Sequence, residues 1–392
     1  MRDAAALVER VEPLLPGIAE RAAEGERLRR LPDETLAALR EADVFRALVS
    51  PERGGHGLGL DSVVALGLTL GQADTATAWV TTFLVMHSWL LSMFPDAVVD
   101  EVFGDRGYAL APAALSPTGT ATPVDGGYEV TGRWSWGTGV MHADCALVTG
   151  VVLTDGLPDL RMVLLDPDQF EVDDVWHTDG MRATGSNDVV CREVFVPAER
   201  TLPFRGLAEG EVTPVAGTPM AGYPVVPVLC LTAATPLVGG AGGALEAYRR
   251  RLAERVLAYS FGERQVEKPA AQIRLARADT DVRTARLLLE DCVRTLDRAY
   301  GPGGGRLARN ERSDLRMATT TAVHTAKAAI TSLCDAAGGS IHLLDQPEGA
   351  QLVPDRRHLR LGGVGVDAQR RGRRDTEVNG HHLARRDLHG GP

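Results

Sequence analysis

Trp136 and Thr138 form the pattern in this sequence that most directly indicates chemistry. They lie two positions apart in residues 132–144, GRWSWGTGVMHAD, a strand-like segment bounded by glycine. An indole offers a large apolar face, and a hydroxyl can donate to or accept from a ring nitrogen. The pair could therefore bind a flat heteroaromatic ring and orient it through one polar contact. A purely structural role is the alternative, with Trp134 and Trp136 on one face of a strand in the core of a β-domain.

His87 is the second candidate, a single histidine in the otherwise apolar segment WVTTFLVMHSWLL. A histidine in such a helix can be a core residue whose ring is satisfied by hydrogen bonds, or it can face an apolar pocket and act as a general base. The sequence alone leaves both roles open. Two other histidines, His142 and His177, lie near the ends of the segments 132–144 and 176–189, and each could simply be a polar residue of a strand.

A further segment, residues 176–189, reads WHTDGMRATGSNDV and follows several strand-like runs. Together with residues 132–144 it resembles the flavin-binding β-domain of the acyl-CoA dehydrogenase fold. The form GMRATGSNDV resembles the group D two-component flavin-dependent monooxygenases within that fold. The resemblance covers roughly residues 5 to 347.

The resemblance implies that a flavin lies between the β-domain and the C-terminal helices, where a neighbouring subunit completes the site. The matching cofactor-binding positions are Trp136, Thr138, Arg182, Thr184, Ser186, Gln272, Gly338 and Gly339. Thr138 would face the flavin N5 and act in catalysis, because a hydroxyl there can hold the proton of a C4a-hydroperoxide. His87 would be the second catalytic residue, facing the substrate and helping to remove the proton of a phenol.

The activity implied by the resemblance is that of an oxygenase component. It would take reduced FMN or FAD from a separate NAD(P)H-dependent flavin reductase, activate O₂ as the flavin C4a-hydroperoxide, and hydroxylate a small aromatic or polyketide-like substrate. One alternative is N-oxygenation of an amino sugar nucleotide by a nitrososynthase. The others are an acyl-CoA dehydrogenase-like flavoenzyme and a non-catalytic scaffold of the same fold. Dehydrogenase chemistry lacks its base, since no glutamate in a YEG-like stretch follows the glycine pair.

The residues after Pro347 depart from the family pattern. A segment resembling PLQRxxRD is expected there, but Pro347 is followed by EGAQLVPDRR, and no Phe, Trp or Tyr occurs from Glu348 onward. We therefore expect an atypical tail from about residue 348 that is diverged, frame-shifted or disordered. His358, His381 and His382 are poor candidates for the family's C-terminal histidine.

Three segments must position these residues. Apolar residues recur at helical spacing before residue 103, which predicts an N-terminal α-helical domain over residues 1–113. Short β-branched runs then predict a central antiparallel β-barrel or sandwich domain over residues 114–210. Long helical patterns with few breakers predict a C-terminal helix bundle over residues 211–392. The class is α+β, in the helix–sheet–helix order of the acyl-CoA dehydrogenase fold, for which a homotetramer is expected.

Composition limits the remaining classes of function. A net charge of −10 argues against non-specific nucleic-acid binding, and the charged N-terminus predicts neither a signal peptide nor a membrane span, so we expect a cytoplasmic protein. The five cysteines lack CxxC spacing, and HExxH, GxxxxGK[ST] and strand-borne GxGxxG motifs are absent, so no metal site is expected. The run GGAGG at residues 239–243 predicts close helix packing or a flexible joint.

Overall fold

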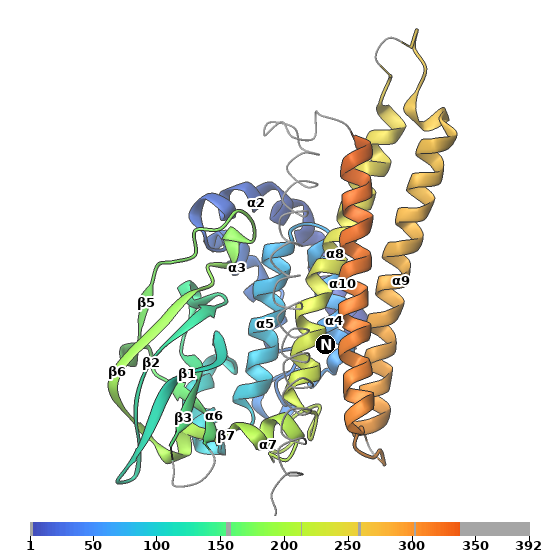
Figure 1. The fold of residues 1–392 in the computed structure, drawn as a ribbon. Coiled ribbons are helices and arrows are strands. Elements are labelled where there is room, and N and C mark those ends of the chain that lie inside the picture. The colour runs from blue at the N-terminus through green and yellow to red at the C-terminus, as the bar shows by residue number, and fades with distance from the viewer. Residues whose placement is uncertain (1–2, 154–157, 213, 258–259, 302, 338–392) are drawn as a thin grey trace, which may run out of the picture.

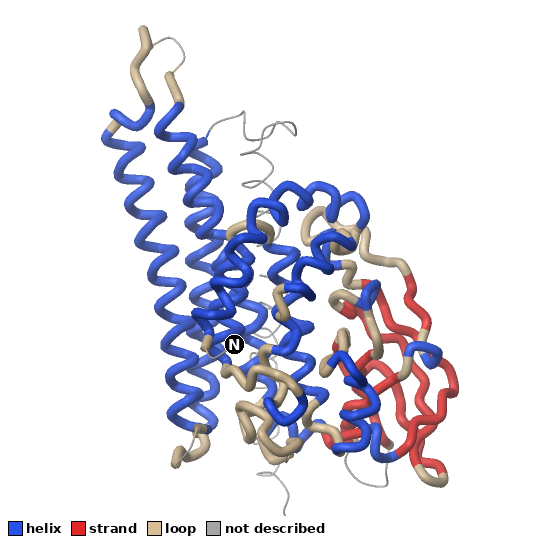
Figure 2. Tube along the Cα trace, turned by 180° about the vertical axis from the view of Figure 1, so that it is seen from behind, coloured by secondary structure: helices blue, strands red, loops and turns tan. Residues whose placement is uncertain are grey.

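The computed structural model of this chain describes residues 3–337, apart from residues 154–157, 213, 258–259 and 302. A sheet lies on one side of the molecule, and the long helices α9 (Pro269–Tyr300) and α10 (Arg309–Ala337) lie on the other (Figure 1). Three helices lie between them: α4 (Leu60–Gly71), α5 (Thr75–Leu91) and α8 (Val225–Glu254). The same arrangement seen from behind separates strand from helix along the whole body (Figure 2). The predicted α+β class and the helix–sheet–helix order are confirmed.

Six helices precede the sheet: α1 (Ala4–Val11), α2 (Leu15–Leu28), α3 (Asp33–Glu41), α4 (Leu60–Gly71), α5 (Thr75–Leu91) and α6 (Asp96–Phe103). Two of them, α1 and α5, begin after an aspartate whose side chain caps the helix. Asp74 caps α5, because its Oδ2 accepts from the backbone nitrogen of Thr77 at 2.7 Å and from its hydroxyl at 2.6 Å. Helices α4 and α5 are apolar on nearly every face and lie almost completely buried. They therefore form an inner layer of the molecule, in which α4 packs against α5 and both pack against α8.

Seven strands form one sheet in the order β5-β6-β2-β1-β3-β4-β7. The strands are β1 (Ala113–Val124), β2 (Gly127–Gly137), β3 (Ala146–Val152), β4 (Asp159–Leu165), β5 (Glu171–Asp173), β6 (Asn187–Pro197) and β7 (Thr201–Pro203).

The sheet is mixed, so the expectation of a wholly antiparallel domain is wrong for one pair. Strand β3 pairs with β1 in the parallel direction, with Ala113 opposite Leu147. The reason is the loop after β2, which ends beside the start of β1 and crosses it before β3 begins. Asp144 fixes that crossing, because its Oδ2 accepts from the backbone nitrogen of Leu110 and its own nitrogen donates to the Leu110 carbonyl, both at 2.8 Å.

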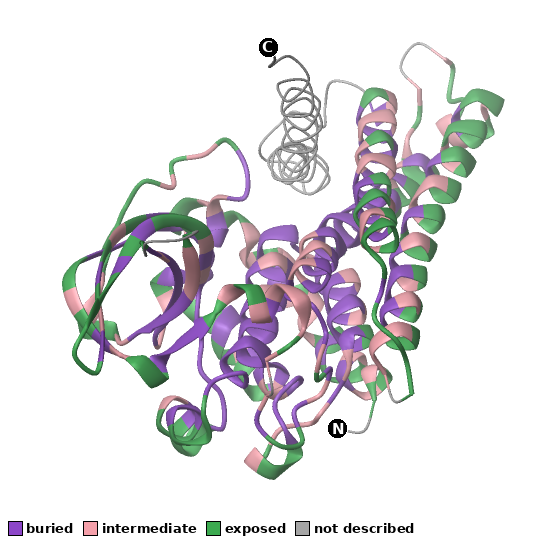
Figure 3. Ribbon diagram, turned by 60° about the horizontal axis from the view of Figure 1, so that its bottom comes forward, coloured by how far each residue is buried: buried purple, intermediate pink, exposed green. Residues whose placement is uncertain are grey.

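In the part of the chain that the structure describes, four α-helices follow the sheet: α7 (Phe204–Glu209), α8 (Val225–Glu254), α9 (Pro269–Tyr300) and α10 (Arg309–Ala337). By length and composition, α8 is the one helix in the described residues that could cross a membrane, but 72% of its most apolar window is buried. It packs against α4, α5, α9 and α10. In this structure α8 is thus the central helix of the bundle, and buried residues concentrate around the middle of the molecule (Figure 3).

The contact between α4 and α8 is made by four glycines, here called the glycine seam: Gly67, Gly71, Gly239 and Gly243. A Cβ at Gly67 would lie 2.2 Å from Oγ1 of Thr235, and a Cβ at Gly239 would lie 2.6 Å from the Gly67 carbonyl oxygen. Backbone therefore meets backbone across this seam, as in close-packed small-residue helix pairs. The run at residues 239–243 serves helix packing, one of the two roles that the sequence left open.

Candidate functional site

The two tryptophans of β2 have opposite environments. Trp134 is fully buried, and its Nε1 donates to the Thr149 carbonyl at 2.8 Å. Trp136 is 64% exposed and has a φ of +72°, in the left-handed region that a bulky residue rarely adopts. The register between β2 and β6 shifts between Trp134 and Gly137, so the alternation of faces breaks there. The structural interpretation thus holds for Trp134 alone, and Trp136 presents its indole outward.

Immediately after Trp136, three predicted site residues meet in a cluster of buried hydroxyls. The Thr138 and Ser186 hydroxyl oxygens are 3.1 Å apart, and those of Ser186 and Thr184 are 2.8 Å apart. Thr184 donates onward to the Met181 carbonyl at 2.8 Å. At the other end, Nε1 of Trp79 donates to Oγ1 of Thr138 at 3.2 Å. We call this series, from Trp79 to the Met181 carbonyl, the hydroxyl chain.

Trp79 is a residue of this cluster that the sequence reasoning missed. It lies on α5, and the contact depends on α5 packing against the short 3₁₀ helix η7 (Arg182–Thr184). A signal was available, because a tryptophan in an apolar helix needs a hydrogen-bond acceptor for its indole N–H. The acceptor could not be named from the sequence, because it lies 59 residues away at Thr138.

The turn that carries Thr184 is held by the end of α2. Oε1 of Glu26 accepts from the backbone nitrogens of Arg182 at 3.1 Å and Ala183 at 3.4 Å. Gly185 has a φ of +52°, and a Cβ there would lie 2.8 Å from the Arg29 carbonyl oxygen. The glycine of the ATGSN motif is therefore required for both its conformation and its contact with α2.

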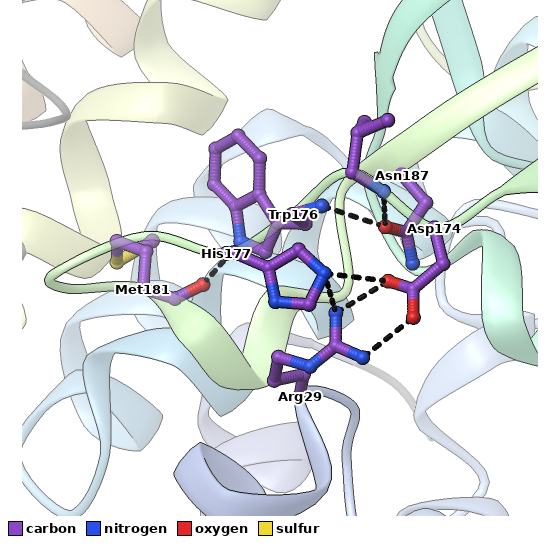
Figure 4. A network of polar contacts seen from close by, with 7 residues as sticks. Arg29, Asp174, Trp176, His177, Met181 and Asn187 are labelled. Atoms are coloured by element: carbon purple, nitrogen blue, oxygen red, sulfur yellow. Dashed lines mark hydrogen bonds and ion pairs between the residues drawn. The ribbon is translucent and has the colours of Figure 1, made fainter.

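A network of polar contacts holds the loop of residues 174–181, which precedes η7 (Figure 4). Oδ1 of Asn187 accepts from the backbone nitrogens of Val175 and Trp176, both at 2.9 Å, and the Trp176 Nε1 donates to the Met181 carbonyl at 2.8 Å. The Met181 carbonyl is thus shared between this network and the hydroxyl chain.

An ion pair joins the same loop to α2. Nη2 of Arg29 donates to Oδ2 of Asp174 at 2.6 Å, and this bond keeps the pKa of the Asp174 carboxyl below its usual value. Nε2 of His177 lies 3.3 Å from Nη1 of Arg29 (Figure 4). His177 therefore belongs to the loop's attachment to α2, and β6 begins only at Asn187.

His87 lies on the same helix as Trp79 and is 1% exposed. Its Nδ1 is 2.6 Å from the Ala111 carbonyl oxygen, and because a carbonyl can only accept, Nδ1 carries the proton. Burial lowers the pKa of His87 to about 4, a shift that the Ala111 carbonyl partly opposes. The ring is therefore neutral at pH 7, with an unprotonated Nε2 that can accept a hydrogen bond.

One face of α5 connects His87 to the hydroxyl chain. Trp79, Phe83 and His87 follow at spacings of four, with ring centroids 4.9 Å apart for the first pair and 5.6 Å for the second. At 1.5 Å per residue, the row spans about 12 Å along the helix axis. The two predicted catalytic residues are thus linked by a row of aromatic side chains.

The remaining predicted site residues have different outcomes. The Nε of Arg182 is buried and has no hydrogen-bond partner among the described residues. Gln272 is exposed on α9 and donates to the Val266 carbonyl at 2.9 Å. Helix α9 lies on the far side of α8 from the sheet (Figures 1 and 2), so a single chain does not bring Gln272 to the hydroxyl chain. Gly338 and Gly339 lie outside the described residues.

A groove with a volume of about 450 Å³ lies elsewhere, between α9 and α10. It is polar and open, and its lining residues are Arg274, His324, Lys327, Ala328, Thr331, Ser332 and Asp335. Among the residues that the structure describes, no predicted site residue lines it.

Comparison with known proteins gives consistent matches. Residues 231–347 match the family model described as "Acyl-CoA dehydrogenase, C-terminal domain". The flavin-dependent monooxygenase oxygenase subunit HsaA of Rhodococcus jostii is 35% identical over 288 residues, which are 71% of this chain and 74% of that protein. The oxygenase component of the FADH(2)-dependent resorcinol hydroxylase of a Rhizobium species is 31% identical over 346 residues, 85% of this chain and 84% of that protein.

Solved structures agree with these relatives. The crystal structure of 3-HSA hydroxylase from a Rhodococcus species matches with a TM-score of 0.82 at 30% identity and covers 91% of each chain. XiaF from a Streptomyces species, solved in complex with FADH2 and glycerol, matches with a TM-score of 0.82 at 28% identity, covering 92% of this chain and 90% of that one.

Proposed function

Because this chain belongs to the oxygenase components of two-component flavin-dependent monooxygenases, we propose that it hydroxylates a small phenol bound along the α5 face. The family uses a reduced flavin, FMN or FAD, with O₂ as co-substrate. The substrate and the roles of individual residues in this chain are the proposal.

The residues around the hydroxyl chain fit a bound flavin. A flavin ring is a large flat surface with a few polar atoms, and the exposed Trp136 indole beside a buried cluster of hydroxyls provides a matching set of contacts. The buried Nε of Arg182 is a donor with no partner in the described structure, as expected where a polar ligand atom binds. Trp136, Thr138, Arg182, Thr184 and Ser186 would hold the ring, which supplies the reducing electrons for oxygen activation.

The observation that carries the choice of substrate is the aromatic row on α5. Its ring faces favour a flat aromatic ligand over a sugar, and the row leads to the neutral His87 ring. The unprotonated Nε2 would accept a hydrogen bond from the phenolic hydroxyl. It would then act as a general base and remove the phenolic proton as the substrate ring is hydroxylated. The relative from Rhizobium is named as a resorcinol hydroxylase, which agrees with this class of substrate.

The partners follow from the family. Oxygenase subunits and components work with a separate component, and we propose an NAD(P)H-dependent flavin reductase. We also propose a cytoplasmic homotetramer in which Gln272, exposed on α9, reaches the flavin of a neighbouring subunit. Gly338 and Gly339 would contribute to the same site.

The test supplies reduced FMN or FAD to the full-length protein with ¹⁸O₂ and either a panel of phenols or an amino sugar nucleotide. We expect one ¹⁸O atom in a hydroxylated phenol. His87→Asn should lower the rate of hydroxylation by about 10²- to 10⁴-fold while flavin oxidation continues. Ser92→Ala, which removes a buried hydroxyl at the end of the same helix, is the control and should keep the rate. Labelling of the amine alone, or the absence of labelled product, would refute the proposal.

A further inference from the structure

The hydroxyl chain has a direction. Each hydroxyl has one proton, whereas a carbonyl has none. Oγ1 of Thr184 lies 2.8 Å from the Met181 carbonyl oxygen, a separation at which two oxygens repel unless a proton lies between them. The proton of Thr184 therefore points to Met181.

The remaining protons follow from that one. Since the proton of Thr184 is engaged, the 2.8 Å contact between Thr184 and Ser186 requires Ser186 to donate. The proton of Ser186 is then engaged as well, so the 3.1 Å contact between Ser186 and Thr138 requires Thr138 to donate. Every hydroxyl proton in the chain points inward, toward the carbonyl.

Trp79 completes the set of contacts at Thr138. An indole N–H can only donate, so the 3.2 Å contact occupies one of the two lone pairs of Oγ1. Thr138 thus accepts from Trp79 and donates to Ser186, and it has one lone pair left. Toward a ligand it can act only as an acceptor.

We propose that Ser186 and Thr184 are positioning residues that make Thr138 an obligate acceptor, and that the site thereby distinguishes reduced from oxidised flavin. The inference rests on the proposed function, in which Thr138 helps to hold the flavin ring, and on the family resemblance, which implies that Thr138 faces the flavin N5. That nitrogen carries a proton in the reduced ring and is a bare acceptor in the oxidised ring. An acceptor at Thr138 pairs with the former and faces the latter lone pair to lone pair.

The proposal is tested by the ratio of two dissociation constants, for oxidised and for reduced FMN, measured anaerobically on the full-length protein. Ser186→Ala removes the internal acceptor for the Thr138 proton, which then turns to N5 of the oxidised ring. Thr184→Val lets Ser186 donate to Thr138, with the same result. In both variants we expect the ratio of oxidised to reduced constants to fall by about 3- to 10-fold, the effect of one hydrogen bond.

Matched variants separate this effect from structural damage. Ser186→Thr keeps the hydroxyl and should restore the ratio, and Thr319→Val, whose hydroxyl bonds only to carbonyls within α10, should not change it. A local loss of structure would weaken both redox forms alike and leave the ratio constant. Trp79→Phe keeps an aromatic ring but removes the donor; because Thr138 still donates to Ser186 in this variant, the ratio should not change.

The outcomes are distinct. Wild-type protein that binds reduced FMN, with an unchanged ratio in Ser186→Ala and Thr184→Val, would overturn the inference while leaving the proposed function intact. Wild-type protein that binds neither form would overturn the proposed function and this inference with it.

Discussion

The buried, neutral His87 predicts that this protein loses stability in mild acid. Burial lowers the pKa of His87 to about 4 in the folded state, while an unfolded histidine titrates near 6.5. Between these values the unfolded chain binds one proton more than the folded chain, so the free energy of unfolding falls as the pH falls. For one such histidine, stability at pH 4.5 is about 2.5 kcal/mol below that at pH 7.5.

His87→Asn isolates this contribution. Asparagine keeps a donor for the Ala111 carbonyl but does not titrate in this range. Denaturant unfolding is measured for both proteins between pH 4.5 and 7.5 at one protein concentration and without flavin. We expect the stability advantage of the wild-type protein over the variant to shrink by about 2.5 kcal/mol across that range.

A matched variant controls for packing. Phe83→Leu alters the ring that packs on His87, at a centroid distance of 5.6 Å, without changing a titrating group. Its destabilisation should therefore be the same at every pH. The reasoning would be refuted if the difference between wild type and His87→Asn were also constant with pH, because His87 would then have the same proton affinity in both states.

Three further predictions follow from packing and hydrogen bonding. Gly239→Ala should lower the free energy of unfolding by about 1–3 kcal/mol, because the added Cβ clashes across the glycine seam. Gly242→Ala on the same helix, where the nearest contact of a Cβ is at 3.7 Å, should raise it by about 0.4–1 kcal/mol. Denaturant unfolding of both variants and the wild-type protein measures the two changes. Glu26→Ala should cost about 1–3 kcal/mol and speed amide exchange at residues 182–183, while Glu24→Ala, which removes only an exposed ion pair, should change stability by less than about 1 kcal/mol. The buried Cys145 thiol, whose pKa is raised by burial, should react with iodoacetamide only as fast as the protein unfolds, and mass spectrometry of the native protein reads this directly; rapid native labelling would contradict its burial.

The sequence predicted the site residues well where two paired strands bring them together. Thr138 and Ser186 are far apart in the chain, but Gly137 pairs with Asn187 across β2 and β6, so neighbouring strands bring the two hydroxyls together. The segments that the family resemblance linked are therefore linked by the sheet itself. The helix–sheet–helix order was equally accessible, since it depends only on a change of hydrophobic period along the chain.

What the sequence did not reveal depends on contacts between elements. The bulge that turns Trp136 outward interrupts the two-residue alternation on which a prediction of faces rests. The contact of Trp79 with Thr138 requires α5 to pack against η7. The parallel direction of β3 depends on how one loop crosses β1. Gln272 is a separate case, because α9 lies on the far side of α8 from the sheet, and its role in the site depends on the assembly proposed above.

The glycine seam also limits how this enzyme can be rebuilt by recombination with its relatives. At most interfaces a mismatch between exchanged parts is absorbed by rotamer changes, but here one main chain contacts the other and no rotamer is available to adjust. Helices α4 and α8 lie more than 150 residues apart in sequence, yet they have to be exchanged together in a recombinant protein. A chimera that takes its N-terminal helices from one parent should therefore take α8 from the same parent. The exception is a pair of parents that both have glycine at all four positions of the glycine seam.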